Sequence, residues 1–453
     1  MVDASGDQPT PPFRHPSQEG ILLICGWGMG ILIVSMNISS SAAPAMSYCI
    51  NPACPAPDKN SSNANFCMFC GTKIRRKDRY RDTSSQMNAE DYFDRGVVKE
   101  DELNDFAGAL VDYNKAIELD PEYMDAYFNR GLLKCLELDD MYGALDDYNK
   151  AIDIDPSDAI NYYFRGLLKH NELDDMYGAL DDYSKAIDID PSDADFYFNR
   201  GLLKYNKIDD IHGAFIDFNK TIDIDQQHAN SYYFCGIIKY RELNDISGAL
   251  TDFNQAILLD QNDVNLYHVR GMLKYEKLND VTGALNDFNK VIDIDPTYSS
   301  SYYWRGILKH RELNDISGAL NDYNKAIELN DIDDESYDYS KSNYNTSLDL
   351  CQSKPYIYNH RGILKHYEIN DISGALNDYN KAIELHRNDA DFYSNRGILK
   401  YQGLSNISGA IQDFRQSAYL YLEQGKTKDL GEAIDHLKEL GASFYSVPLK
   451  IKK

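Results

Sequence analysis

The sequence has few basic residues, few cysteines and no apolar run of bilayer length, and each of the first two shortages excludes a class of protein. Its 46 Lys and Arg are outnumbered by 72 Asp and Glu, which gives a formal net charge of -26. An acidic surface repels phosphate, so we expect no nucleic-acid partner. Eight cysteines in 453 residues are too few for a scaffold held together by disulfides.

Sequence signatures of catalysis are missing as well. The chain has no glycine-rich phosphate loop, no His-Arg-Asp catalytic loop and no Asp-Phe-Gly motif. No nucleophile elbow or metal-hydrolase helix stands out. The Asp-Ile-Asp strings lack the glycine and the terminal glutamate of a calcium loop. We therefore expect a protein that is not an enzyme and that has no small-molecule substrate.

What the sequence has in abundance is internal repetition with a period of 35 residues. In each copy a tyrosine is followed four residues later by a glycine and further on by a Gly-Ala dipeptide, as in Tyr127, Gly131 and Gly143-Ala144. A fixed period of this length indicates a stacked repeat architecture. One interval of 56 residues interrupts the spacing before the last two of the nine tyrosines, which are Tyr92, Tyr127, Tyr162, Tyr197, Tyr232, Tyr267, Tyr302, Tyr358 and Tyr393.

Each copy is predicted to form two helices joined by a short polar turn. In the second copy, apolar residues at three- and four-residue spacing predict helices over 126–138 and 142–154. The first-helix glycine is expected to face the second-helix alanine, so that the two backbones approach closely. Prolines end four copies: Pro121, Pro156, Pro191 and Pro296. Aspartates are predicted to cap the second helices: Asp140, Asp175, Asp210, Asp245, Asp280, Asp315 and Asp371.

This pattern resembles the tetratricopeptide repeat family over about residues 89–424. The resemblance rests on six positions and their counterparts, namely Tyr127, Gly131, Ala144, Tyr148, Ala151 and Pro156. It implies an all-α fold, a right-handed superhelical solenoid of about nine helix pairs. The family's usual period is 34, and the extra residue here falls in the Leu-Asn-Asp turn. Cys235 replaces the arginine of other copies, and residues 425–453 are expected to form a capping helix and tail.

In the resembled family, first helices line a concave groove that binds peptide segments, so the resemblance implies a groove here. An aromatic row follows each repeat tyrosine by one residue, and an outer row lies seven residues further on the same helix face. Packing between neighbouring helices is the alternative for both rows. The residues expected to contact a partner are Phe128, Tyr163, Phe198, Tyr233 and Tyr303 in the aromatic row, and His170, Tyr205, Tyr240, Tyr275, His310, His366 and Tyr401 in the outer row.

Three Asn-Arg-Gly strings are similar to the family's clamps for a C-terminal carboxylate. They begin at Asn129, Asn199 and Asn395. Other copies replace the asparagine, and the body is acidic. We expect the regularly spaced Arg and Lys to form a structural ladder with acidic neighbours instead.

Four cysteines gather before the repeats. Cys49 and Cys54 are separated by four residues, Cys67 and Cys70 by two, and a spacer of twelve lies between the pairs. Four thiolates at such spacing predict one structural Zn²⁺ in a closed tetrahedral site, a zinc ribbon over residues 46–75. Two disulfides or a redox pair are the alternatives. The segment resembles the zinc-ribbon leaders of some bacterial signalling proteins.

Three further segments carry weaker signals. Residues 20–36 form an apolar run that falls short of the roughly 20 residues needed to cross a bilayer. For residues 1–45 three interpretations stay open: a mis-assigned start ahead of Met46, a membrane anchor, or a signal peptide. Residues 76–88 read as a basic linker. The acidic insertion near 330–354 reads as a mobile loop, with a docking or phosphorylation site as the alternative.

Together these patterns predict a cytoplasmic, non-enzymatic scaffold whose groove binds a peptide segment of a partner protein. One alternative is a regulatory component of a bacterial signalling pathway, linked to a kinase or to transcription, that docks through the zinc ribbon. Another is an assembly factor tethered to a membrane through residues 20–36. Repeat arrays serve all three roles, so the resemblance does not choose between them.

Overall fold

The computed structural model describes residues 87–333 and 354–443, and before them the backbone of four short strands. β1 (Leu22–Leu23) pairs antiparallel with β2 (Leu32–Ile33), and β3 (Ser47–Cys49) pairs antiparallel with β4 (Ile74–Arg76). Three predictions fall largely outside the described residues: the apolar run, the basic linker and the acidic insertion. The side chains of the four predicted zinc ligands also lie outside them.

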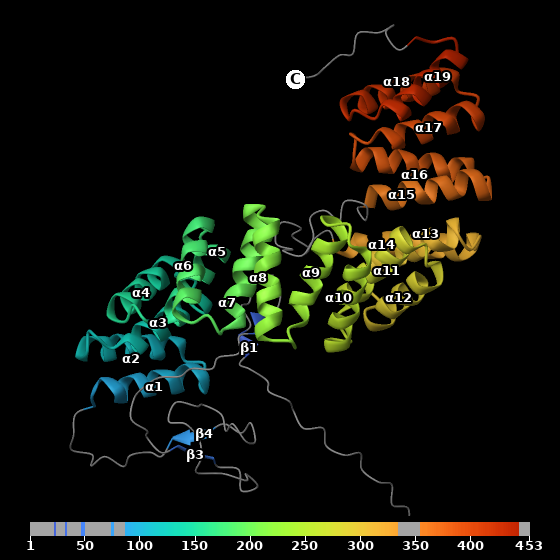
Figure 1. The fold of residues 1–453 in the computed structure, drawn as a ribbon. Coiled ribbons are helices and arrows are strands. Elements are labelled where there is room, and N and C mark those ends of the chain that lie inside the picture. The colour runs from blue at the N-terminus through green and yellow to red at the C-terminus, as the bar shows by residue number, and fades with distance from the viewer. Residues whose placement is uncertain are drawn as a thin grey trace, which may run out of the picture. The chain divides into compact units, whose positions relative to one another are not determined.

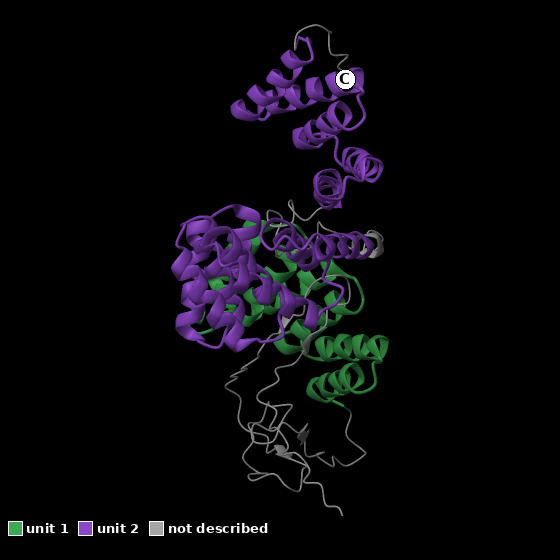
Figure 2. Ribbon diagram, turned by 90° about the vertical axis from the view of Figure 1, so that its right-hand side faces the viewer, with its two compact units in different colours: residues 1–199 green, residues 200–453 purple. Residues whose placement is uncertain are grey.

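The helices follow one another in pairs, and each pair is one 35-residue copy (Figure 1). The chain divides into two compact units, residues 1–199 and 200–453 (Figure 2). The helices that lie wholly in the first unit are α1 (Ala89–Asp101), α2 (Phe106–Leu119), α3 (Met124–Leu136), α4 (Met141–Ile154), α5 (Ala159–Asn171) and α6 (Met176–Ile189). α7 (Ala194–Leu203) spans the boundary and continues into a π-helical turn, Lys204–Ile208.

The second unit continues the same alternation. Its helices are α8 (Ile211–Ile224), α9 (Ala229–Arg241), α10 (Ile246–Leu259), α11 (Val264–Leu278), α12 (Val281–Ile294), α13 (Ser299–Arg311), α14 (Ile316–Asp333), α15 (Lys354–Leu364), α16 (Ile372–Leu385), α17 (Ala390–Gln402), α18 (Ile407–Glu423) and α19 (Thr427–Glu439). A second π-helical turn, Lys365–Ile369, follows α15. The described residues thus form nine helix pairs and a final single helix, which is the predicted all-α solenoid of helix pairs.

Side chains cap the second helices as predicted. Asp140 accepts a hydrogen bond from the Gly143 amide at 2.9 Å, and the other predicted aspartates do the same in their own copies. The glycine has a steric reason, because a Cβ on Gly143 would lie 2.0 Å from the Asp140 carboxylate. The Gly-Ala dipeptide is therefore partly a capping signature.

The extra residue of the 35-residue period lies in a left-handed turn. Asp139 has a φ of 54°, and the Asp140 amide donates to the Lys134 carbonyl, six residues earlier, at 2.9 Å. This turn ends α3 at Leu136, two residues before the predicted end. Asn and Asp tolerate this conformation better than other non-glycine residues. Eight of the nine copies place one of them there, and the ninth has Ser405.

The expectation about the first-helix glycine needs a correction. A Cβ on Gly131 would lie 3.0 Å from Cε1 of Tyr148, and one on Gly236 would lie 2.6 Å from Cε1 of Phe253. The glycine therefore makes room for an aromatic ring of the second helix and does not face the alanine. Ala144 and its counterparts are buried all the same, at 0% exposure.

The array continues across the insertion and ends under a cap. α14 is helical through Asp333, four residues into the predicted loop, because no proline or glycine follows Leu329 to end it. Beyond the insertion, Arg361 donates to Asn324 at 2.7 Å, so the seventh and eighth copies stay stacked. α19 packs on α18 through Leu437, as expected of a capping helix.

Candidate functional site

An arginine, an aspartate and a lysine form an ion cluster in eight copies. In the second copy, Arg130 donates to both carboxylate oxygens of Asp147 at 2.5 and 2.9 Å, and Lys134 Nζ lies 2.8 Å from the same carboxylate. Bidentate pairs of this kind are among the strongest that arginine makes. The other clusters are Arg95-Asp112-Lys99, Arg165-Asp182-Lys169, Arg200-Asp217-Lys204, Arg270-Asp287-Lys274, Arg305-Asp322-Lys309, Arg361-Asp378-Lys365 and Arg396-Asp413-Lys400.

The same arginine joins neighbouring copies. Arg130 Nη1 donates to Oδ1 of Asn114, in the preceding copy, at 2.6 Å, and its guanidinium lies 5.4 Å from the centroid of the Tyr127 ring. Five further arginines make the corresponding bond to asparagine at 2.7–2.8 Å. These contacts confirm the predicted structural ladder. They also engage the guanidinium groups inside the array, including those of the Asn-Arg-Gly strings at 129 and 395.

The fifth copy departs from this pattern at Cys235. The thiol is buried, and burial raises its pKa to about 12. Asp252 is paired with Lys239 at 2.6 Å, and burial raises the pKa of the Asp252 carboxyl. Asn219 of the preceding copy donates to the carbonyl of Phe215, in its own helix, at 2.7 Å. The joint therefore lacks the guanidinium that bridges neighbouring copies elsewhere.

The structure encloses most of the predicted aromatic row between helices. Tyr163, Tyr233 and Tyr303 are each 2% exposed and Phe198 is 8% exposed, whereas Phe128 is half-buried. The Tyr163 ring lies 4.9 Å from that of Phe196 in the next copy, and its hydroxyl accepts from Asn199 Nδ2 at 3.0 Å. The four buried side chains therefore pack between neighbouring helices, which was the alternative interpretation of this row. Their contact with a partner stays a prediction.

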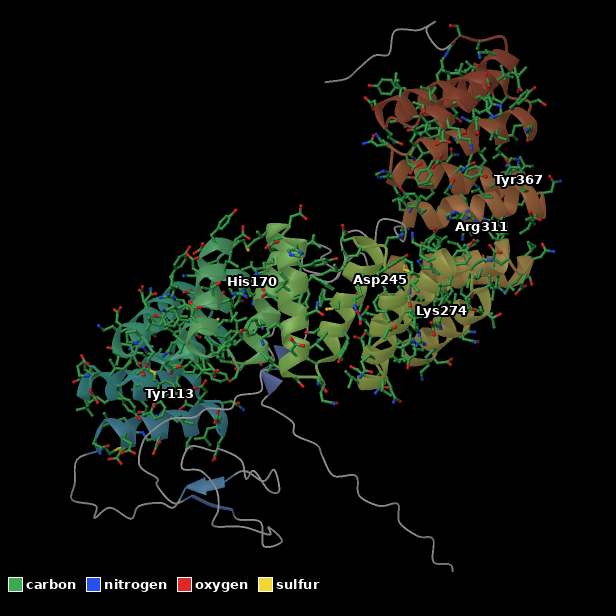
Figure 3. All side chains as sticks on the ribbon, viewed as in Figure 1. Tyr113, His170, Asp245, Lys274, Arg311 and Tyr367 are labelled. Atoms are coloured by element: carbon green, nitrogen blue, oxygen red, sulfur yellow. The ribbon has the colours of Figure 1, made fainter. Side chains whose placement is uncertain are left out.

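The residue type at each outer-row position depends on an aromatic residue in the second helix of the same copy. The sequence analysis did not predict this relation. Where the second helix has tyrosine, the outer row has Glu, Cys or His. Where it has phenylalanine, the outer row has tyrosine. Tyr113 donates to Glu100 at 2.6 Å, and His170 Nδ1 lies 3.3 Å from the Tyr183 hydroxyl. Figure 3 labels Tyr113 and His170 among the side chains of the array. The pairs are Glu100/Tyr113, Cys135/Tyr148, His170/Tyr183, Tyr205/Phe218, Tyr240/Phe253, Tyr275/Phe288, His310/Tyr323, His366/Tyr379 and Tyr401/Phe414.

The outer row also differs in exposure from copy to copy. His170 and His366 are 8% exposed and Tyr240 is 7% exposed, while Tyr401 reaches 36%. The other three residues predicted from this row to contact a partner, Tyr205, Tyr275 and His310, are half-buried.

The tyrosines of copies four to six are held by the copy that follows. Tyr275 donates to Glu312 at 3.3 Å, and Tyr240 donates to Glu276. The Tyr205 and Tyr275 rings make edge contacts with Phe234 and Trp304, at 5.8 and 6.3 Å between centroids. Burial raises the pKa of Tyr205 and Tyr275 above the usual value of tyrosine. Both hydroxyls therefore stay protonated at neutral pH.

Two other sequence predictions concern a metal site and a membrane-spanning segment. Among the residues whose side chains are described, no three His, Cys, Asp or Glu gather as metal ligands would. The predicted zinc ligands Cys49, Cys54, Cys67 and Cys70 lie outside that set. Within the described ranges, no helix combines the length and the apolar character needed to cross a bilayer.

Several solved structures are similar to parts of this chain. A tetratricopeptide repeat protein from Parabacteroides merdae is 20% identical with a TM-score of 0.41, over 56% of this chain and 94% of that one. YrrB, described as a TPR protein with an unusual peptide-binding site, is 22% identical with a TM-score of 0.37, over 43% and 97%. MamA from Desulfovibrio magneticus is 19% identical with a TM-score of 0.35, over 39% and 96%.

Family models match four stretches of the chain. The model described as TPR repeat matches residues 102–134, 174–207 and 364–403, and the one described as Tetratricopeptide repeat matches residues 125–158. None of the curated proteins matches the chain. The matched stretches fall on helices of the array described above, and they show that the chain carries tetratricopeptide repeats in these stretches.

Proposed function

We propose that this chain is a non-enzymatic protein-interaction scaffold whose first helices bind a peptide segment of a partner protein. The observation that carries the proposal is the recurrence of partly accessible tyrosine rings at one position of three repeat copies, the fourth, the sixth and the ninth. Tyr205 and Tyr275 are half-buried, and Tyr401 is 36% exposed. Rings that are accessible on one side and fixed on the other are what interfaces use as anchors.

The neighbouring copies hold these rings in place before any partner binds. Phe234 and Trp304 support the Tyr205 and Tyr275 rings, and Glu312 accepts from the Tyr275 hydroxyl. A side chain that is already ordered loses little rotamer entropy on binding. In this proposal the enclosed aromatic row sets the shape of the first-helix surface, and the accessible residues of the outer row make the contacts.

Peptide selection against the full chain tests the proposal. Peptides chosen from a random library are then measured against the double variant Tyr205→Ala/Tyr275→Ala, which should bind at least about tenfold more weakly, since each ring is an anchor. The matched control is Tyr142→Ala/Tyr177→Ala, on second helices, where the side chains are 74% and 75% exposed. Equal affinity for wild type and both variants would count against the first-helix surface, provided that thermal melting shows all three folded.

We also propose that Cys49, Cys54, Cys67 and Cys70 bind one structural Zn²⁺. The proposal rests on their spacing in the sequence. It is supported by the antiparallel pairing of Cys49 with Ile74, which brings together the backbone at both ends of the cysteine segment. A closed four-thiolate site has no open position for water, so it would order the segment without adding chemistry.

Metal analysis of the full chain tests this second proposal. We expect about one zinc per chain, and loss of that zinc in Cys67→Ser/Cys70→Ser, with the helical circular dichroism signal of the array retained. The control is Cys235→Ser, in the fifth copy, which should keep the zinc. A wild-type protein without zinc after purification in zinc-supplemented medium contradicts the proposal.

A further inference from the structure

In α1, one apolar residue is exposed at a position that is buried in every other first helix. Val98 is 44% exposed, whereas the equivalent Leu or Ile of the other eight copies is at most 3% exposed. Those equivalents are Leu133, Leu168, Leu203, Ile238, Leu273, Leu308, Leu364 and Leu399. The first copy therefore presents to solvent the position that is part of the core elsewhere.

Inside the array, the second helix of the preceding copy covers this position. Leu133 of α3 clusters with Ala109 and Tyr113 of α2, and Phe106 and Leu110 pack against them. The same stripe recurs where Leu399 of α17 is covered by α16 through Ile372, Ala375, Leu376 and Tyr379. The covering helix thus uses positions i, i+3, i+4 and i+7, which lie on one face of a helix.

A polar contact accompanies the apolar stripe. Asn114, at i+8 of the α2 stripe, accepts from Arg130 at 2.6 Å. In the first copy, Nη1 of the corresponding Arg95 contacts Met87 Sδ at 3.5 Å, and thioether sulfur is a weak acceptor. The Arg95 side chain is 45% exposed, compared with 15–18% for the arginines of the other clusters.

A surface hollow of about 350 Å³ adjoins this face and is lined in part by Tyr92, Arg95, Val111 and Lys115. Val111 is 63% exposed, and seven of the eight equivalent residues in other copies are Asp, Asn, Gln or Thr. Apolar groups are therefore combined here with charges of both signs, because Asp112 and Glu118 also line the hollow and pair with Arg95 and Lys115. Such a surface favours a partner with an apolar stripe and an oxygen acceptor.

We propose that the face of α1 around Arg95 and Val98 is a docking site for one amphipathic helix of a partner protein. The helix takes the place that a preceding second helix would have. It carries apolar residues at i and i+4, a small residue at i+3, an aromatic residue at i+7 and a carboxamide at i+8, the pattern of the chain's own second helices. The site uses residues other than those of the outer row, so it is independent of the function proposed above.

A second copy of this chain is a poorer occupant. Its second helices have the required stripe, but the following helix already covers it, as α3 covers α2 and α19 covers α18. Freeing one of them would require a helix pair to open, at the cost of buried apolar contacts. A helix supplied by another protein carries no such cost.

A peptide with the sequence of residues 105–120 is the probe, because it contains the stripe, Asn114 and the capping Asp105. Fluorescence anisotropy should show saturable binding to the full chain. Its affinity should fall about tenfold or more for Val98→Lys, since a charge would have to be buried. The same change at another exposed residue, Leu243→Lys, is the control, because Leu243 is 55% exposed and lies in a turn. It should leave binding unchanged.

Three results overturn the proposal. The peptide shows no saturable binding, or it binds wild type and Val98→Lys equally, or sedimentation shows a dimer that Val98→Lys dissolves, which would make a second copy the occupant. Loss of affinity when Asn114 of the peptide is replaced by Ala supports the polar contact with Arg95. Circular dichroism must show that Val98→Lys is folded, as expected for a residue exposed on the wild-type surface.

Discussion

Copies five and six of the array have nearly the same helices but differ at one buried joint. In copy six, Arg270 holds Asp287 with two bonds of 2.6 and 3.0 Å and reaches Asn254 in the preceding copy at 2.7 Å. In copy five, Cys235 stands in place of the arginine, and Lys239 alone is seen to pair with Asp252. The fold tolerates the exchange, so the arginine is a source of stability and not a condition for forming the helix pair.

The physical difference lies in how the buried aspartate is compensated. A buried carboxylate needs both a charge partner and hydrogen bonds to offset its desolvation. Where the arginine is missing, the desolvation of the buried carboxyl outweighs the hydrogen bond and charge of Lys239, so the pKa of Asp252 is raised. Copy five should therefore be the least stable joint of the second unit, and four predictions test this.

The largest effect should come from making copy six resemble copy five. Arg270→Cys removes a bidentate partner from Asp287 and breaks the bond to Asn254. We expect a loss of about 3 kcal/mol in the free energy of unfolding, measured by chemical denaturation, because a buried charge loses its main partner. An unchanged denaturation midpoint would show that the ladder contributes little to stability.

The two aspartates should respond differently to the loss of their charge. Asp287→Asn, in copy six, should cost about 2 kcal/mol, because it weakens a satisfied ion cluster. Asp252→Asn, in copy five, should cost under about 1 kcal/mol, because the charge removed is poorly compensated. Equal losses in denaturation experiments would mean that the two joints do not differ energetically.

Restoring the arginine should strengthen copy five. Cys235→Arg places a guanidinium beside Asp252, Asn219 and the Tyr232 ring, the three partners that arginine has in other copies. We expect a gain of about 1 kcal/mol, smaller than the loss above because the new side chain must also be ordered and buried. Cys235→Ser controls for the removal of the thiol, and it should give no gain.

The smallest effect concerns pH. A carboxyl whose pKa is raised by folding binds its proton more tightly in the folded state, so its penalty is full above the folded pKa and absent below the unfolded one. As the pH falls from 7 through the raised pKa of Asp252, its contribution to stability should become less unfavourable. The gain from Cys235→Arg should therefore be larger at pH 7 than near pH 4. Thermal melting of wild type and Cys235→Arg at both pH values measures this gain. A larger gain near pH 4 than at pH 7 would contradict the assignment of the effect to Asp252.

Much of the fold could be predicted because a period of 35 residues repeats each local signal nine times. The capping aspartates, the helix pairs and the arginine ladder all follow from residues that recur at fixed spacing. The role of the first-helix glycine was misread, because both Ala144 and Tyr148 recur at the same spacing and periodicity does not say which of them faces Gly131.

The candidate site was harder to predict, because burial depends on neighbours that a single copy does not contain. Tyr163 and Tyr205 are both aromatic residues of a first helix, yet the first is enclosed by the next copy and the second is half-buried. The outer row has histidine opposite Tyr183 and tyrosine opposite Phe218. This relation is visible in the sequence, but only when each first helix is compared with the second helix of its own copy. The residue type gives no signal for the exposure of Val98, since valine suits a buried position equally well. Only its place in the first copy distinguishes it from the equivalent residues.

Hydrogen exchange of the full chain tests the central claim most directly, because it reports the stability of each helix pair separately. We predict that amides of α9 and α10, in copy five, exchange faster than those of α11 and α12, in copy six. In Cys235→Arg, exchange of α9 and α10 should slow to match that of copy six. Equal protection of the two copies in the wild-type chain, with no change in the variant, would contradict the claim that the arginine ladder sets the stability of each joint.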